Sequence, residues 1–152
     1  MKKPETKFIE AVHKELRSKK EYPYVQAMGS MFMNGTPDRY YEGKGPILWA
    51  EYKFIPRAEL IRKPYDVNVT PLQNAWLERA KGNNQKAVVI IGRYFAQRYI
   101  ALIREENFDA PVTPEQFANI GIWGFVSTVA DYLITETDFD ATVTNPDSSV
   151  LR

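Results

Sequence analysis

The sequence predicts a single α/β domain with the element order α-β-β-β-α-β, followed by a β-α addition at the C-terminal end. Three observations support this order: apolar residues at helical spacing near the start, strand-like apolar runs in the middle, and two Thr-Pro pairs that mark helix starts. A chain of 152 residues has the length of one domain with one hydrophobic core.

The N-terminal half predicts one helix and three extended segments. Residues 4–17 form an amphipathic helix, because their apolar side chains recur at helical spacing. An extended segment over 24–33 ends at an Asn-Gly turn. A short strand at 38–42 and a long strand at 47–55 are joined by a turn rich in glycine, so we expect a hairpin. A basic loop covers 56–69.

The C-terminal half predicts two helices and two strands. Thr70-Pro71 begins a helix that ends near Lys81, with the threonine as N-cap. The apolar run 86–94 has the character of a buried strand, and 98–104 is its expected antiparallel partner. A second Thr-Pro pair opens a helix over 114–133. This helix is apolar around much of its circumference, and its two glycines would allow close approach of another element.

Charge is distributed unevenly along the chain. Residues 1–104 carry 19 Lys and Arg against 10 Asp and Glu, whereas residues 105–152 carry 1 against 9. A basic body favours a polyanion such as nucleic acid as partner, and solubility is the simpler explanation. We expect residues 1–134 to form the domain and the acidic residues 135–152 to form a flexible tail.

Composition excludes several classes of protein. The chain has no cysteine, which excludes disulfides and thiolate zinc sites and favours a reducing compartment. Its one histidine, His13, excludes a histidine-rich metal centre and argues against a Ser-His-Asp hydrolase. No apolar run reaches the length of a membrane span or of a signal peptide. We therefore expect a cytoplasmic protein without a membrane partner.

The strand 47–55 carries the sharpest anomaly. Both of its faces are mostly apolar, which predicts an internal strand, yet Glu51 and Lys53 lie on one face of it. Buried charges are costly unless they are paired or bind an ion. The hairpin brings Asp38 towards them, and two carboxylates are what Mg²⁺ needs, with water and phosphate completing its ligands. A Glu–Lys ion pair at the rim of the sheet is the structural alternative.

These residues resemble a known nuclease signature. Pro37-Asp38 followed by Glu51-Tyr52-Lys53 resembles the PD-(D/E)XK motif. The segment Gly35-Thr36-Pro37-Asp38, the strand 48–53, and the helix start 70–77 with its Gln73 and Trp76 resemble the VRR-NUC branch of that superfamily. The resemblance covers about residues 5–94 and leaves 95–134 as an extension. It implies a restriction-endonuclease-like core, a mixed sheet flanked by helices.

The resemblance implies a metal-dependent endodeoxyribonuclease that acts on branched DNA such as a Holliday junction or flap. Mg²⁺ would be the cofactor, with Mn²⁺ able to substitute. Asp38, Glu51 and the Tyr52 main-chain carbonyl would be metal ligands, and Lys53 would orient or activate the attacking water. Glu10 on the first helix would complete the metal shell, and Glu5 is the competing candidate.

The remaining candidate residues have both functional and structural interpretations. The resemblance makes Gln73 a polar contact beside the lysine, whereas its spacing from Thr70 predicts a capping box. His13 is a general-base candidate, although a position on the helix surface is the default. The predicted phosphate contacts are Arg39, Arg57, Arg62 and Lys63.

Two further expectations concern partners and competing functions. The apolar helix 114–133 would either cover the sheet or form a subunit interface, and we expect a homodimer. The alternative function is a non-catalytic nucleic-acid-binding or assembly protein that keeps the nuclease fold. A purely structural domain, in which Glu51 and Lys53 form only an ion pair, is a third possibility.

Overall fold

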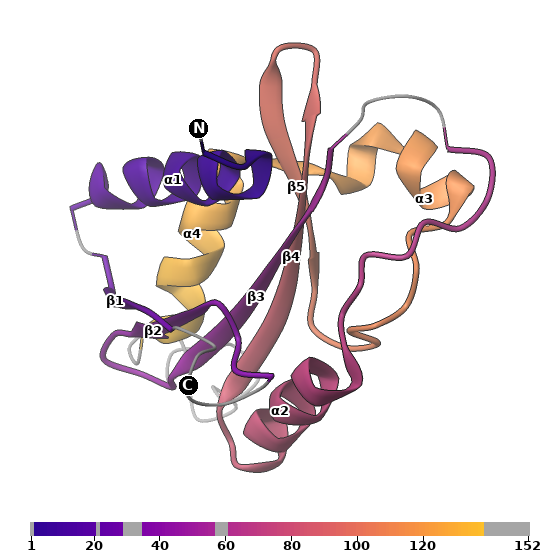
Figure 1. Cartoon of the computed structure of the whole chain (residues 1–152). Coiled ribbons are helices and arrows are strands. Elements are labelled where there is room, and N and C mark those ends of the chain that lie inside the picture. Colours follow the sequence, from indigo (N-terminus) through magenta and orange to yellow (C-terminus); the bar gives the residue numbers. More distant parts are fainter. Residues whose placement is uncertain (1, 21, 29–34, 57–60, 139–152) are drawn as a thin grey trace, which may run out of the picture.

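The computed structural model describes residues 2–20, 22–28, 35–56 and 61–138. Six strands form one sheet in the order β1-β2-β3-β4-β5-β6, with helices on both faces (Figure 1). The strands are β1 (Tyr24–Ala27), β2 (Arg39–Glu42), β3 (Leu48–Ile55), β4 (Lys86–Phe95), β5 (Arg98–Arg104) and β6 (Gly124–Phe125). Only β3 and β4 pair in parallel, and all other neighbours are antiparallel. The predicted α/β class and mixed sheet are confirmed.

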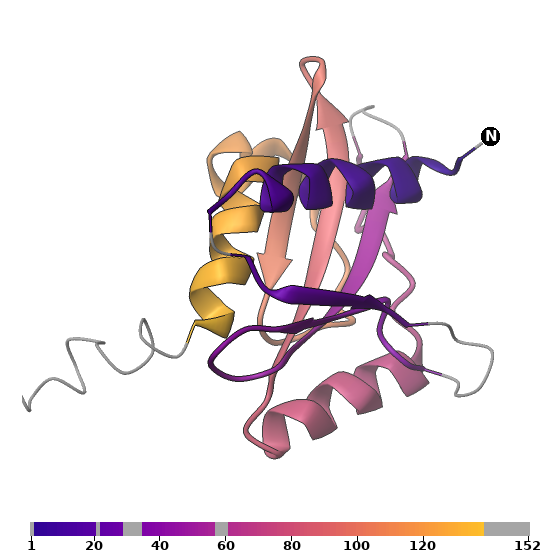
Figure 2. The same ribbon diagram turned by 90° about the vertical axis from the view of Figure 1, so that its left-hand side faces the viewer.

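The helices α1 (Pro4–Arg17) and α4 (Val126–Thr137) cover one face of the sheet. Figure 2 shows α1 crossing the strands on this side. Buried residues of α1 and α4 pack there on alternate residues of β3 and β4, such as Tyr52 and Ile90. Gly92 is required here, because a Cβ at this position would lie 2.5 Å from the ring of Phe8. Helix α1 is therefore held close against the central strands.

The opposite face is covered by α2 (Pro71–Gly82), by α3 (Pro114–Ala118) and by the loop that precedes α2. Leu77 and Ala80 of α2 pack there on Val89 and Ile91 of β4. Parallel pairing of β3 and β4 requires a crossover connection, and α2 supplies it. This face is the one that carries Glu51 of β3, so α2 begins beside that residue.

The continuous helix predicted over 114–133 is wrong. The chain instead forms α3, a 3-10 turn η1 (Ile120–Ile122), strand β6 and then α4. The side-chain oxygen of Asn119 accepts a hydrogen bond from the Gly121 amide at 3.2 Å and so caps the start of η1 directly after α3. Gly124 then pairs with Ala101 of β5. The apolar residues of this segment therefore serve two separate helices and an edge strand.

Smaller differences concern element ends. Strand β1 is observed over 24–27, and residues 29–34 of the predicted extended segment lie outside the described residues. Helix α4 reaches Thr137, three residues into the segment predicted as the tail, while 139–152 lie outside the described residues. No helix of the described chain is long and apolar enough to span a bilayer.

Candidate active site

Asp38 lies directly before β2, where the backbone pairing of β2 with β3 ends. The final pair is Arg39 opposite Ala50, so Tyr52 lies beyond it. At Tyr52 the carboxylate of Asp38 replaces the backbone partner, because its Oδ2 accepts a hydrogen bond from the Tyr52 amide at 2.9 Å. The amide and carbonyl of a strand residue point to the same side, so the Tyr52 carbonyl faces this same edge of β3.

Gly35 brings the segment that carries Asp38 close to the start of α2. Its φ is +85°, a conformation that favours glycine. A Cβ at this position would lie 2.7 Å from the Leu72 backbone. A side chain here would therefore push the Asp38 segment away from α2, which also carries Gln73.

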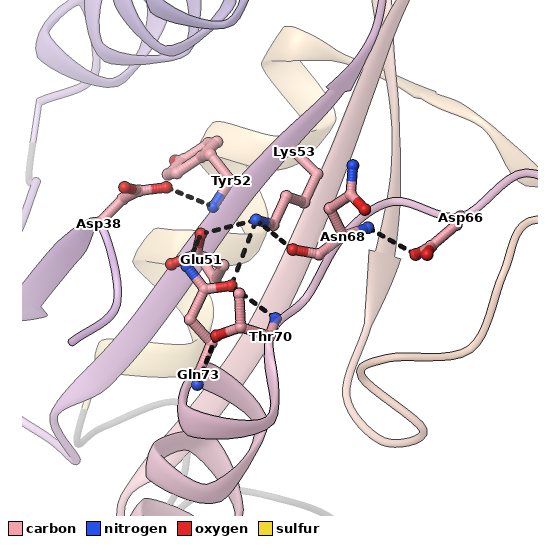
Figure 3. A network of polar contacts seen from close by, with 8 residues as sticks. All are labelled: Asp38, Glu51, Tyr52, Lys53, Asp66, Asn68, Thr70 and Gln73. Atoms are coloured by element: carbon pink, nitrogen blue, oxygen red, sulfur yellow. Dashed lines mark hydrogen bonds and ion pairs between the residues drawn. The ribbon is translucent and has the colours of Figure 1, made fainter. Parts of the chain in front are cut away.

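Glu51 and Lys53 lie on one face of β3, as predicted (Figure 3). Lys53 Nζ is 3.3 Å from Glu51 Oε2. Glu51 is 2% exposed, and no hydrogen-bond partner is found among the described residues for its second oxygen, Oε1. The strand is internal to the sheet, so the ion pair is not at a sheet rim. We call Asp38, Glu51 and Lys53 the cluster. It contains a buried carboxylate, that of Glu51, with one acceptor atom that no described residue uses.

The loop before α2 fixes the ammonium group of Lys53. Lys53 Nζ donates to the Asn68 carbonyl at 2.9 Å and to Gln73 Oε1 at 3.2 Å. Asn68 has a φ of +64°, and its amide donates to Asp66 Oδ1 at 2.7 Å. The Asp-x-Asn turn thus presents the carbonyl to the lysine. Sequence reasoning missed this contribution, although the Asp-x-Asn spacing is a signal of such a turn.

Gln73 fulfils both roles that the sequence left open. Its Oε1 accepts a hydrogen bond from the backbone amide of Thr70 at 2.9 Å, and the backbone amide of Gln73 donates to Thr70 Oγ1 at 3.1 Å. These two bonds form a capping box. Its Nε2 also donates to Glu51 Oε2 at 2.9 Å. One side chain therefore joins the N-terminus of α2 to the buried carboxylate.

The electrostatics of the cluster favour a bound cation. Burial, with the negative charge of Asp38 adding to it and the positive charge of Lys53 opposing it, raises the pKa of Glu51 to about 8. Desolvation thus penalises the ionised form of the very carboxylate that has an unpartnered oxygen. A divalent cation between the acidic groups would offset both costs.

The donor set fits Mg²⁺ with few protein ligands. No group of three or more Asp, Glu, His or Cys side chains in the described part of the chain forms a ready-made metal cluster. Mg²⁺ is usually held by one or two carboxylates, with waters and substrate phosphates as its other ligands. Asp38 and Glu51, with the Tyr52 carbonyl on the adjacent edge, match that pattern.

The two candidate glutamates of α1 differ in their surroundings, and a role of either in the metal shell stays a prediction. Glu10 is exposed, and its carboxylate pairs with Lys2 at 2.8 Å. Glu5 is half-buried, and burial raises its pKa, with the charge of Asp38 adding to the shift and that of Lys53 opposing it. Glu5 is therefore electrostatically coupled to the cluster.

His13 is half-buried rather than on the helix surface. Its Nε2 lies 2.7 Å from the Tyr41 hydroxyl, which lies 2.6 Å from the Tyr52 hydroxyl. Burial, together with the positive charges of Arg39 and Arg17, lowers the pKa of His13 to about 4. The chain of three side chains lies on the face of β3 opposite to Glu51, so it ties α1 to the strand from behind.

The predicted phosphate contacts lie in different places. Arg39 borders the cluster, and its Nη1 donates to the Asp38 carbonyl at 2.9 Å. Arg62 and Lys63 are exposed on the loop before α2, and Arg57 lies outside the described residues. Contact of these side chains with DNA stays a prediction.

Comparisons with known proteins give structural likenesses only. No family model matches the chain, and no curated protein matches it. Among solved structures, the chain is similar to Hjc, a Holliday junction resolvase from the archaeal hyperthermophile Archaeoglobus fulgidus. The TM-score is 0.49 at 11% identity, over 85% of this chain and 97% of that chain. At 11% identity, any conclusion about function depends on the residues of the cluster and not on this likeness.

Proposed function

We propose that this protein is a Mg²⁺-dependent endodeoxyribonuclease of the PD-(D/E)XK type, related to the VRR-NUC branch. One observation carries the proposal. The buried Glu51 has one oxygen paired with Lys53 and Gln73, and its other oxygen has no partner among the residues that the structure describes, while Asp38 is fixed on the adjacent edge of β3. Most buried polar side-chain atoms have a hydrogen-bond partner, so a purely structural ion pair gives no reason for this carboxylate oxygen to lack one.

Each residue has a defined task in phosphodiester hydrolysis. Asp38, Glu51 and the Tyr52 carbonyl would hold the ion, which when bound activates water and neutralises charge on a phosphate oxygen. Lys53 orients the attacking water and offsets the negative charge that develops on the phosphate. Gln73 and the Asn68 carbonyl fix the ammonium group of Lys53, so little reorganisation is needed during the reaction.

The substrate class follows from charge and from the motif resemblance. The basic body of the chain favours a nucleic acid, because positive charge neutralises backbone phosphates. The resemblance to the VRR-NUC motifs favours branched DNA such as a four-way junction or a flap. Glu5 would complete the metal shell directly or through water, in place of Glu10.

The deciding experiment compares cleavage of a four-way junction, a flap and a plain duplex in Mg²⁺, Ca²⁺ and EDTA. Cleavage of a branched substrate in Mg²⁺ alone is expected. Asp38→Asn and Lys53→Ala should abolish cleavage and leave DNA affinity largely intact, because neither removes the basic surface. DNA binding without cleavage under every condition would favour the non-catalytic alternative instead.

A homodimer remains part of the proposal, on a different basis from the one first expected. The continuous helix does not form, but exposed apolar side chains remain at the β6 edge of the sheet and in η1 beside it, namely Ile120, Ile122 and Phe125. Sedimentation of the wild type at micromolar concentration should show a dimer, and Phe125→Asp should shift it to a monomer. A wild-type monomer would contradict this proposal without touching the catalytic one.

A further inference from the structure

Three aromatic rings lie in a row beside the catalytic cluster. They are Tyr40 of β2, Trp49 of β3 and Trp76 of α2, and we call them the aromatic row. The ring centroids of Tyr40 and Trp49 are 5.1 Å apart, and those of Trp49 and Trp76 are 5.5 Å apart. Both pairs are edge-to-face, with interplanar angles of 70°. The guanidinium of Arg79 lies 5.0 Å from the Trp76 centroid.

The aromatic row shares its sheet face with the cluster. Trp49 precedes Glu51 by two residues, and side chains two apart on a strand lie on one face, about 7 Å from each other. Tyr40 pairs with Trp49 across β2 and β3, so it lies on the same face. The row therefore begins within about one nucleotide of the proposed site of cleavage.

The rings are fixed in place but only half-buried. Trp49 Nε1 donates to Gln85 Oε1 at 2.8 Å, and the Tyr40 hydroxyl donates to Glu42 Oε1 at 2.6 Å. By contrast, Tyr41 and Tyr52 on the opposite face have no exposed surface. Beyond Tyr40 the face is open, since Tyr24 of β1 is 60% exposed. Trp49 packs against the core on the α2 face, so the row is preorganised and lies at the rim of that core.

Positive charge lies at one end of the aromatic row, where the guanidinium of Arg79 lies over the Trp76 ring on α2. At the other end, the hydroxyl of Tyr40 donates to the carboxylate of Glu42. Aromatic rings that alternate with cationic side chains are the usual surface for single-stranded nucleic acid, because rings stack on bases and cations track the phosphates. The charge and the position of the row therefore favour a single strand of nucleic acid as its ligand.

We propose that the aromatic row is a stacking platform for unpaired DNA bases next to the cleaved phosphate. This inference rests on the proposed function and narrows its substrate to DNA with unpaired nucleotides at the cleavage site. Every base presents a π face, so the platform recognises structure rather than sequence. Bases inside a continuous duplex have both faces covered by their neighbours and cannot use it.

The test uses the tryptophans of the full chain as reporters. Two of the three, Trp49 and Trp76, belong to the aromatic row, and Trp123 is buried at 7% exposure. The Asp38→Asn protein is titrated in EDTA with an oligothymidylate and with a blunt duplex of the same length, so cleavage cannot interfere. The single strand should quench tryptophan fluorescence, and the duplex should not.

Matched variants then assign the effect to the row. Tyr40→Ala and, on a different element, Trp76→Leu should each weaken single-strand binding about tenfold in fluorescence anisotropy. Tyr40→Phe keeps the ring and should keep the affinity. Tyr94→Ala removes a 47% exposed tyrosine of β4 outside the row and should also keep it. Circular dichroism checks that each variant is folded.

The outcomes separate this inference from the proposed function. Equal affinity for both DNAs without quenching, or an equal loss in Tyr94→Ala and Tyr40→Ala, would overturn the stacking platform. Absence of binding to any DNA would overturn it as well. Metal-dependent cleavage by the wild-type protein is measured separately, so quenching without cleavage would contradict the nuclease proposal while supporting the platform.

Discussion

The side-chain amide of Gln73 donates a hydrogen bond to Glu51 Oε2 at 2.9 Å. The same side chain closes the capping box with Thr70 and accepts from Lys53. Gln73, in the first turn of α2, is thereby bonded to both Glu51 and Lys53, the members of the buried ion pair. Helix α2 consequently cannot shift its N-terminus without disturbing the cluster.

The two roles of Gln73 can be separated by mutation. Thr70→Ala removes the cap bond alone and should lower the free energy of unfolding by about 1 kcal/mol. Gln73→Ala keeps that bond, which the backbone amide of residue 73 donates, and removes the reciprocal bond from the Thr70 amide together with the contacts to Glu51 and Lys53. Its cleavage rate should therefore fall about 10- to 100-fold. Denaturant unfolding and single-turnover cleavage measure the two effects. Equal loss of cleavage in both variants would mean that Gln73 acts only through the cap.

Stability in EDTA should depend on the ionisation of Glu51. Its pKa is about 8 in the folded protein against 4.5 as the ordinary value, so between these pH values the folded state binds more protons than the unfolded state. The free energy of unfolding should therefore fall as pH rises from about 4.5 to 8, by at most about 1.4 kcal/mol per pH unit from this group.

Glu51→Gln supplies the control, because an amide has no proton to lose in this range. The difference in unfolding free energy between wild type and Glu51→Gln, measured in urea at several pH values, should grow with pH in favour of the variant. A difference that is flat from pH 5 to 8 would show that Glu51 keeps its ordinary pKa.

Much of this cluster could be predicted because neighbouring strand positions are simple to place. Alternation puts Glu51 and Lys53 on one face, and a short hairpin fixes where Asp38 comes to lie. The antiparallel pairing of 86–94 with 98–104 follows from the same local rules. These features depend on residues close together in the sequence.

The features that the sequence left open, or for which it predicted another structure, depend on orientation or on distant partners. Glu5 and Glu10 lie about 140° apart around one helix, so only the packing of Phe8 against the sheet decides which of them reaches the cluster. The apolar pattern of 114–133 suits one helix, but pairing of Gly124 with Ala101 of β5 gives a strand instead. Such tertiary pairing overrides local pattern.

The single histidine offers a clean test of the network behind the site. Burial and the charges of Arg39 and Arg17 lower the pKa of His13 to about 4 from the ordinary 6.5. The unfolded state therefore binds more protons between these values, so the free energy of unfolding should fall as pH drops from about 6.5 to 4. NMR of the imidazole resonances measures the pKa directly. Titration near pH 6.5 in the folded protein would contradict the buried contact with Tyr41.

The glutamates of α1 form a matched pair for testing the fourth ligand. Glu5 is half-buried and coupled to Asp38, whereas Glu10 is exposed and pairs with Lys2. Glu5→Gln removes a negative charge near the ion and should weaken Mn²⁺ binding about 10- to 100-fold, measured by isothermal titration calorimetry. Glu10→Gln makes the same chemical change on the same helix and should leave Mn²⁺ affinity unaltered. Because the two variants differ only in where the charge lies, a larger effect from Glu10→Gln would mean that the N-terminal helix turns its other face to the metal.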